Sequence, residues 1–345
     1  MARNPKIEFF KIKLNATKSD GNTTFRDLFT GIYDTKNPKN KKTDLSDKVL
    51  MKTFLEHIFT NISGKFKVDN SKKKAFYVKG SAKDLNDSVK LGTDNFIVHG
   101  LVKGGPYDTG KEEGDLNNPL GDNKKLKKAS ILLDDFYFLL YTPLDKDTGV
   151  LILQNYTSDQ IADIFKPFVK GLFRVEKKSY NAYLQEFMPL EMQKDFKENS
   201  AIKKFVFSNQ YLISDLDEDV KSTGKFTVQL TVSASDTDIN LNNLPYWRKI
   251  MRKIKFDVPG NEPRFVESFN NQNAYIKDET AKSNPTKFSL DDDLLKIRAT
   301  IYLENHIGLE ENRIPKWKEL EKFAQETLKD IVIPEVYPED FIDEN

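Results

Sequence analysis

The chain has 345 residues, enough for one large domain or two ordinary ones, and its 25 Phe and 13 Tyr predict a packed core, because disordered chains are poor in aromatic residues. The absence of cysteine excludes disulfides, thiolate nucleophiles, cysteine-ligated zinc and iron–sulfur clusters. The formal net charge is +1, but the charge is unevenly distributed. Residues 1–130 carry 26 Lys and Arg against 16 Asp and Glu, and residues 131–345 carry 28 Lys and Arg against 37 Asp and Glu. This indicates either an acidic partner for the basic half or attraction between the halves.

The amino-terminal stretch "MARNPKIEFFKIKLN" lacks the apolar core of a signal peptide. No apolar run in the chain approaches the roughly 18 residues that a membrane-spanning helix needs. We therefore expect a cytoplasmic protein with no membrane partner. The bias towards Lys, Asn, Asp, Ile, Phe and Tyr is typical of AT-rich genomes, so we expect a bacterial or prophage gene.

The first part of the chain predicts strands around one helix. Residues 6–15 predict an opening strand. Residues 45–64 predict a helix, because apolar residues recur every four positions and Gly64 stands where a left-handed residue would end it. Residues 65–80 predict two short strands on either side of a lysine-rich turn, and residues 95–105 predict another strand.

A glycine-rich loop is expected near residues 100–128, because six of the sixteen glycines lie between Gly100 and Gly121. The strongly apolar residues 131–156 then predict a hairpin near the centre of a sheet. Residues 157–173 predict a helix, in which Thr157 and Gln160 have the spacing of a capping box.

Polar residues 179–199 predict a helical connector that is broken at Pro189. We place the domain boundary there, which gives a basic N-terminal α+β domain (1–178) and a C-terminal α+β domain (179–345). Residues 201–213 and 225–235 predict strands, and the second alternates apolar and polar residues, as in an antiparallel sheet with one solvated face.

Hairpins are more evident in the sequence than strand–helix–strand units. This favours the α+β class, with mixed, mostly antiparallel sheets, packed helices and two lobes. Near the end of the chain, residues 294–304 predict a strand, residues 314–331 predict a helix, and residues 334–345 form an acidic tail.

The segment "YWRKIMRKIKF" lies in a predicted amphipathic helix, residues 244–256. Four apolar residues fall at i, i+3, i+4 and i+7 and form one stripe: Trp247, Ile250, Met251 and Ile254. Five cations lie off this stripe: Arg248, Lys249, Arg252, Lys253 and Lys255. Ordinary solvent-exposed helix faces alternate Glu with Lys, whereas no acid stands between Asn243 and Lys255.

This pattern predicts a surface for phosphate groups or for an acidic protein, and the alternative is that the chain's own acidic tail neutralises it. A second basic cluster ends the glycine-rich loop and is expected to serve the same role: Lys124, Lys125, Lys127 and Lys128. The partner is thus expected to be nucleic acid or another protein, and the sequence also allows a homo-oligomer.

The sequence predicts no catalytic residue, metal site or cofactor. The three histidines, His57, His99 and His306, are far apart along the chain, which excludes a histidine-rich metal site within one element. The acidic loops at Asp145–Asp147 and Asp215–Asp219 lack the carboxylate that a calcium-binding EF-hand needs at its twelfth position. Phosphate-binding glycine motifs and a serine nucleophile elbow are also absent.

The competing hypothesis is a divergent Mg²⁺-dependent nuclease that uses Asp134, Asp135 or the acids at 215–219. A nuclease of the PD-(D/E)xK kind would need an acid and a lysine on the following strand, where Gln154 and Tyr156 stand. We therefore expect a non-catalytic binding or regulatory component of a bacterial or prophage system, such as antiviral defence, that binds nucleic acid or a partner protein through its basic surfaces.

Overall fold

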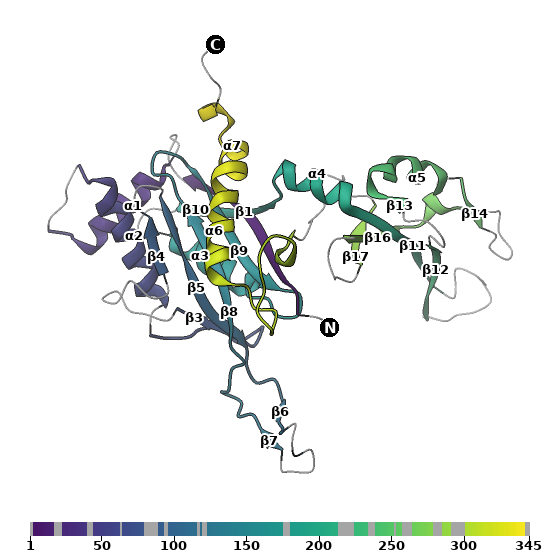
Figure 1. Ribbon diagram of the computed structural model, residues 1–345, viewed down its shortest axis with the longest axis horizontal. Helices are drawn as coiled ribbons and strands as arrows, with labels where there is room; N and C mark the ends of the chain where they lie inside the picture. Colours follow the sequence, from purple (N-terminus) through teal and green to yellow (C-terminus); the bar gives the residue numbers. More distant parts are fainter. Residues whose placement is uncertain are drawn as a thin grey trace. The chain divides into compact units, whose positions relative to one another are not determined.

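The computed structural model describes residues 3–16, 23–39, 44–62, 64–78, 89–92, 96–115, 118, 123–174, 180–212, 224–233, 239–251, 253–256, 264–278, 285–290 and 301–341. The chain divides into two compact units. The first comprises Met1–Phe187 and Ile307–Ala324, and the second comprises Met188–His306 and Gln325–Asn345. The expected α+β class is confirmed, because helices pack with antiparallel sheets, one of which is curled (Figure 1).

The first unit is built on a sheet with the strand order β10-β1-β9-β8-β5-β3-β2, and β4 also pairs with β5. All of these pairings are antiparallel. The strands are β1 (Pro5–Ala16), β2 (Lys67–Asp69), β3 (Lys74–Tyr77), β4 (Val89–Gly92), β5 (Ile97–Pro106), β8 (Asp134–Tyr141), β9 (Thr148–Tyr156) and β10 (Tyr180–Phe187). The opening strand and the predicted hairpin at 131–156 are thus confirmed.

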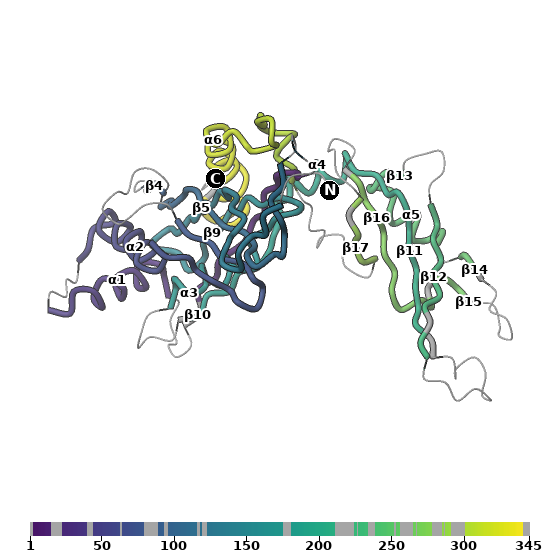
Figure 2. Tube along the Cα trace, turned by 90° about the horizontal axis from the view of Figure 1, so that it is seen from below, coloured from purple at the N-terminus to yellow at the C-terminus, as the bar shows by residue number. Residues whose placement is uncertain are grey.

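Helices lie on both faces of this sheet (Figures 1 and 2). One face is covered by α1 (Phe25–Lys36), α2 (Asp47–Ile62) and α3 (Ala162–Leu172), and the other by α6 (Trp317–Thr327), whose residues up to Ala324 belong to this unit. The rings of Phe29 and Phe54 stack at 4.2 Å, and Phe54 stacks on Phe173 at 5.7 Å. These buried rings join α1 and α2 to the end of α3 by removing a large apolar area from water.

The helix predicted at 157–173 begins later than its sequence suggested, at Ala162. The Oγ1 of Thr157 accepts a hydrogen bond from the backbone N–H of Asn4 (3.1 Å), so the predicted capping box is wrong. No side chain among the described residues caps α3, whose N-cap residue is Ile161; the Oδ1 of the buried Asn155 accepts the backbone N–H of this residue at 3.1 Å. The start of α3 is therefore set by a side chain of the preceding strand.

Two further predictions for the first unit are corrected. The glycine-rich segment 100–128 contains the end of β5 and a short hairpin of β6 (Glu112–Glu113) and β7 (Lys124–Lys125). The connector expected to be helical from 179 begins with β10, which pairs with the edge of β1. Ala182 and Leu184 of β10 pack against the core, which explains why a polar segment adopts a strand. Helix α4 (Leu190–Asn199) begins only after Pro189.

The second unit contains a sheet with the order β12-β11-β16-β17, and β13 also pairs with β11. Its strands are β11 (Ser200–Leu212), β12 (Lys225–Ser233), β13 (Ile239–Asn240), β16 (Asn271–Asp278) and β17 (Thr286–Ser289). A separate two-stranded ladder joins β14 (Lys255–Phe256) to β15 (Arg264–Phe265). The strands predicted at 201–213 and 225–235 are confirmed, and they pair with each other.

One face of this sheet is apolar and packed. Phe205, Phe207 and Ala274 are buried on it, and the ring of Phe288 lies 6.4 Å from that of Phe196 in α4. On the edge strand β12, the apolar residues of the alternating pattern are half-buried and the polar ones are exposed, as the sequence predicts. Within the described residues of the whole chain, no helix is long and apolar enough to cross a membrane.

Candidate functional site

The basic segment of the second unit divides between a helix and a strand. Helix α5 covers only Leu244–Met251, with Leu244 and Met251 buried, and Trp247 half-buried. The predicted helix 244–256 is thus too long, because Lys255 pairs with Phe265 in the ladder of β14 and β15. Arg252 lies outside the described residues.

The side chain of Arg248 binds another part of the same chain. Its side chain is half-buried, and its guanidinium donates a hydrogen bond to the backbone carbonyl of Leu290. Arg248 therefore ties α5 to the residue that follows β17, and we assign it a structural role.

Lys249 and Lys253 are exposed, and no acidic side chain in the described part of the chain forms an ion pair with either. Lys255 is also exposed, and its Nζ lies 4.8 Å from the centre of the Phe265 ring. In the acidic tail, the carboxylate of Glu335 accepts the backbone N–H of Leu190 at 2.7 Å. Among the described acids, the tail thus does not neutralise these lysines.

The second predicted cluster has acids opposite it. In the hairpin of β6 and β7, Glu112 faces Lys125 and Glu113 faces Lys124. The Nζ of Lys125 lies 3.9 Å from a carboxylate oxygen of Glu112. Lys127 and Lys128 are exposed. The hydrogen bond and the charge of Lys73 lower the pKa of Asp108, and the charge of Lys128 adds to this effect. The charge of this cluster in the first unit is therefore partly compensated, whereas Lys249 and Lys253 form no ion pair with a described acid.

The sheet of the second unit has a polar face opposite its apolar one. Directly paired residues of an antiparallel sheet lie on the same face, so the registers define rows across it. The first row is Ser233, Lys204, Tyr275 and Lys287. The second row is Thr231, Val206, Asn273 and Ser289, and the third is Gln229, Ser208 and Asn271. Val206 and Asn273, in the middle of the second row, are buried, and the other residues of the rows are half-buried or exposed. We call these three rows the polar face.

The first row places an aromatic ring between two lysines. Tyr275 of β16 is paired with Lys204 of β11 on one side and with Lys287 of β17 on the other. The Nζ of Lys204 lies 4.6 Å from the centre of the Tyr275 ring, and Lys287 is exposed. Lys277, two residues along the same strand, lies on this face as well.

We predict no strand from the sequence between residues 269 and 287, a stretch rich in asparagine, so our predicted site residues do not include this row. The signal was present as a period of two in β16. Asn271, Asn273 and Tyr275 alternate with Gln272, Ala274 and Ile276, of which Ala274 and Ile276 are buried. One polar residue on the inner side, Gln272, obscured the pattern.

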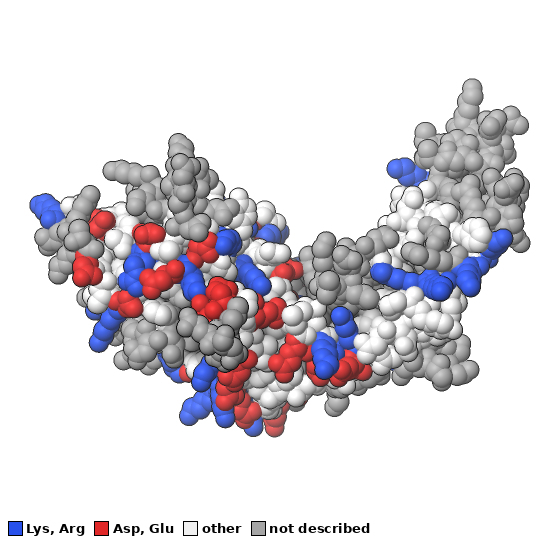
Figure 3. Space-filling model, turned by 90° about the horizontal axis from the view of Figure 1, so that it is seen from above, with Lys and Arg blue, Asp and Glu red and all other residues white. Residues whose placement is uncertain are grey.

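Among the side chains that the structure describes between residues 200 and 290, all the charged ones are basic. Between residues 200 and 290, the side chains that the structure describes include nine Lys and Arg and no Asp or Glu. The nine are Lys203, Lys204, Lys225, Arg248, Lys249, Lys253, Lys255, Lys277 and Lys287. The full sequence of this range has 13 Lys and Arg against 11 Asp and Glu, and the side chains of all 11 acids lie outside the described set. Figure 3 shows described lysine and arginine side chains of this unit in blue.

The carboxylates considered for a nuclease are engaged elsewhere in the first unit. Asp134 forms an ion pair with Arg3, and Asp135 with Lys103 at 2.8 Å. Burial raises the pKa of Asp134 above its usual value, and the charge of Arg3 opposes this effect. Among the described residues, no three His, Asp or Glu side chains lie close enough together to hold a metal ion. The acids at 215–219 lie outside the described residues.

No protein-family model and no curated protein matches this chain. The function is therefore inferred from the surfaces themselves.

Proposed function

We propose that the protein is a non-catalytic binding component that holds nucleic acid through the exposed lysines of the basic segment in its second unit. The observation that carries this proposal is that Lys249 and Lys253 are exposed and form no ion pair with an acid that the structure describes. Phosphate groups are the natural counterpart of such a surface, since every lysine that contacts a phosphate releases a condensed counterion.

The exposed lysines of the basic segment supply the best-defined contacts. Lys249 and Lys253 are four residues apart, project from α5 and the turn after it, and have no ion-pair partner among the described acids. A cation that is already paired must break that pair to bind phosphate, whereas these two lysines have no such pair to break with any acid that the structure describes. An acidic protein surface would satisfy the same charges, and the experiment below separates the two kinds of partner.

The test measures binding of fluorescently labelled DNA and RNA at two salt concentrations. Replacing Lys249 and Lys253 together with Ala is expected to weaken binding several-fold at low salt. The slope of log affinity against log salt concentration should become shallower by about 2, because two phosphate contacts are lost. Fluorescence anisotropy reports both quantities.

The matched control replaces Lys48 and Lys52 with Ala. These lysines are also exposed, also four residues apart, and lie at the start of α2 in the first unit. This double substitution should leave unchanged both the affinity for nucleic acid and the slope of log affinity against log salt concentration. Equal loss in both double variants, or no binding of either polymer by the wild type, would contradict the proposal. In the second case a co-purified acidic protein becomes the candidate partner.

An added Mg²⁺ arm tests the competing nuclease hypothesis. A pure binder retains the labelled strand intact, whereas a nuclease degrades it and loses this activity on Asp134→Ala or Asp135→Ala. The setting we propose, a bacterial or prophage system such as antiviral defence, is supported by the composition of the chain alone.

A further inference from the structure

The polar face of the second unit has the chemistry of a surface that meets bases as well as phosphates. An aromatic ring, Tyr275, stands in one row with Lys204 and Lys287 on the two neighbouring strands. The next rows contribute amide and hydroxyl groups, including Asn271 and Gln229, both of which are exposed. The described side chains of this face include no carboxylate.

We propose that this face binds single-stranded nucleic acid, with one base stacked on Tyr275 and the flanking phosphates at Lys204 and Lys287. This inference rests on the proposed function and specifies its substrate class. If Lys204 and Lys287 bound only the phosphate backbone, the aromatic ring of Tyr275 between them would not be needed. Stacking requires an aromatic face that a base can reach, and cations on either side of it neutralise the phosphates that come with the base.

A single strand fits this face better than a duplex. The rows run across a sheet whose strands are about 4.8 Å apart, so they present a broad surface and not a protruding helix that could enter a groove. In a duplex, the flat faces of the bases are stacked inside the helix and cannot reach Tyr275. Unpaired bases expose both their faces and their edges, and the edges match the amides of Asn271 and Gln229.

The contact between Lys204 and Tyr275 is compatible with this role. The Nζ of Lys204 lies 4.6 Å from the ring centre, in a cation–π contact at a half-buried site. Such contacts are weak near the surface, and the lysine side chain has several rotatable bonds. The ammonium can therefore move from the ring to a phosphate while a base takes its place.

The experiment compares three labelled probes of about 12 nucleotides: oligothymidylate, the same strand with abasic sites, and a duplex. Wild-type protein should bind oligothymidylate about tenfold more tightly than the abasic strand, because only the former has bases to stack. Tyr275→Leu should abolish this preference, and Tyr275→Phe should keep it. Tyr183→Leu is the matched control, since Tyr183 is 55% exposed on β10 of the first unit, and it should keep the preference.

A second variant tests the flanking charges. Replacing Lys204 and Lys287 together with Ala should weaken binding of the base-bearing and abasic strands by the same factor, since it removes phosphate contacts and leaves the ring. Far-UV circular dichroism establishes that each variant is folded.

The outcomes separate this inference from the proposed function. If no probe binds, the proposed function fails and this inference fails with it. If the wild type binds oligothymidylate and the abasic strand equally, prefers the duplex, or keeps its preference in Tyr275→Leu, nucleic-acid binding stands and the single-strand inference is overturned.

Discussion

At the scale of single residues, His99 is the clearest case of a buried ionisable group. It lies in β5, and the charged groups facing it are Lys90 of β4 and Glu321 of α6. Burial lowers the pKa of His99, and the charge of Lys90 lowers it further, whereas the carboxylate of Glu321 opposes both effects. The carboxylate of Glu321 lies 3.9 Å from Nε2 of His99 but only 2.8 Å from the Nζ of Lys90. Its negative charge is therefore shared between His99 and Lys90.

The lowered pKa of His99 predicts a pH-dependent stability. The unfolded chain protonates this histidine near its ordinary pKa of 6.5, whereas the folded protein protonates it only at lower pH. Between these two values the unfolded state binds more protons, so the free energy of unfolding should fall as the pH drops below about 6.5. Urea unfolding at pH 7.5 and pH 5.5 should show a smaller difference for His99→Gln than for the wild type.

The control for this experiment is His306→Gln, because His306 is exposed. It should reproduce the wild-type difference between the two pH values. Identical pH dependence in His99→Gln and the wild type would show that His99 does not contribute.

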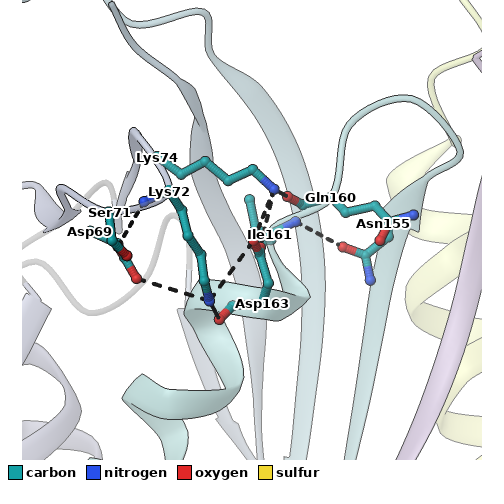
Figure 4. A network of polar contacts seen from close by, with 8 residues as sticks. All are labelled: Asp69, Ser71, Lys72, Lys74, Asn155, Gln160, Ile161 and Asp163. Atoms are coloured by element: carbon teal, nitrogen blue, oxygen red, sulfur yellow. Dashed lines mark hydrogen bonds and ion pairs between the residues drawn. The ribbon is translucent and has the colours of Figure 1, made fainter. Parts of the chain in front are cut away.

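At the scale of elements, the start of α3 is held by a network from the turn between β2 and β3 (Figure 4). The Nζ of Lys74 donates to the backbone carbonyl of Gln160 at 2.8 Å and forms an ion pair with Asp163 at 3.1 Å. The Nζ of Lys72 donates to the carbonyl of Asp163 at 2.6 Å. Lys72 and Lys74, at the lysine-rich turn that the sequence predicts, therefore have a structural role.

Lys74→Met should destabilise the protein, because it removes a half-buried ion pair and a hydrogen bond to a backbone carbonyl. We expect a loss of about 1 kcal/mol in the free energy of unfolding. Urea unfolding followed by circular dichroism measures it. Lys67→Met is the control, since Lys67 is exposed on the neighbouring β2, and equal stabilities of the two variants would rule out the role of Lys74.

At the scale of the whole molecule, the chain forms two compact units and crosses between them more than once. The first unit has a large cluster of buried aromatic and aliphatic residues around α1, α2 and α3. The second buries a smaller set around β11 and β16, including Phe205, Phe207 and Ile276. The protein has two tryptophans, and each unit contains one: Trp317 in the first and Trp247 in the second.

This distribution allows the two units to be followed separately. Trp247→Phe leaves a fluorescent reporter in the first unit, and Trp317→Phe leaves one in the second. Because each unit has its own core, we expect two urea midpoints about 0.5–1 M apart, with the first unit unfolding at the higher concentration. Circular dichroism of the wild type should show both steps. Coincident midpoints in the two variants would mean that the chain unfolds as one cooperative body.

The sequence by itself determined those features that depend on neighbouring residues. The helix at α2, the hairpin of β8 and β9 and the alternation in β12 follow from periodicities of 3.6 and 2, which are visible within a dozen residues. The α+β class follows from them. The cationic character of Lys249 and Lys253 was also evident, because it needs only the absence of acids nearby in the chain.

Only the tertiary structure decided what depends on distant partners. Residues 180–187 are polar enough to read as a helix, yet they form a strand because the edge of β1, more than 160 residues away, offers a ladder and a core to cover. The same holds for the polar face, where Lys204, Tyr275 and Lys287 become neighbours through the pairing of three strands. A local sequence pattern does not specify which strands pair, since the backbone of one strand can form the same hydrogen bonds with many other strands. The partner is selected by which pairing buries the apolar side chains on the two faces of the sheet.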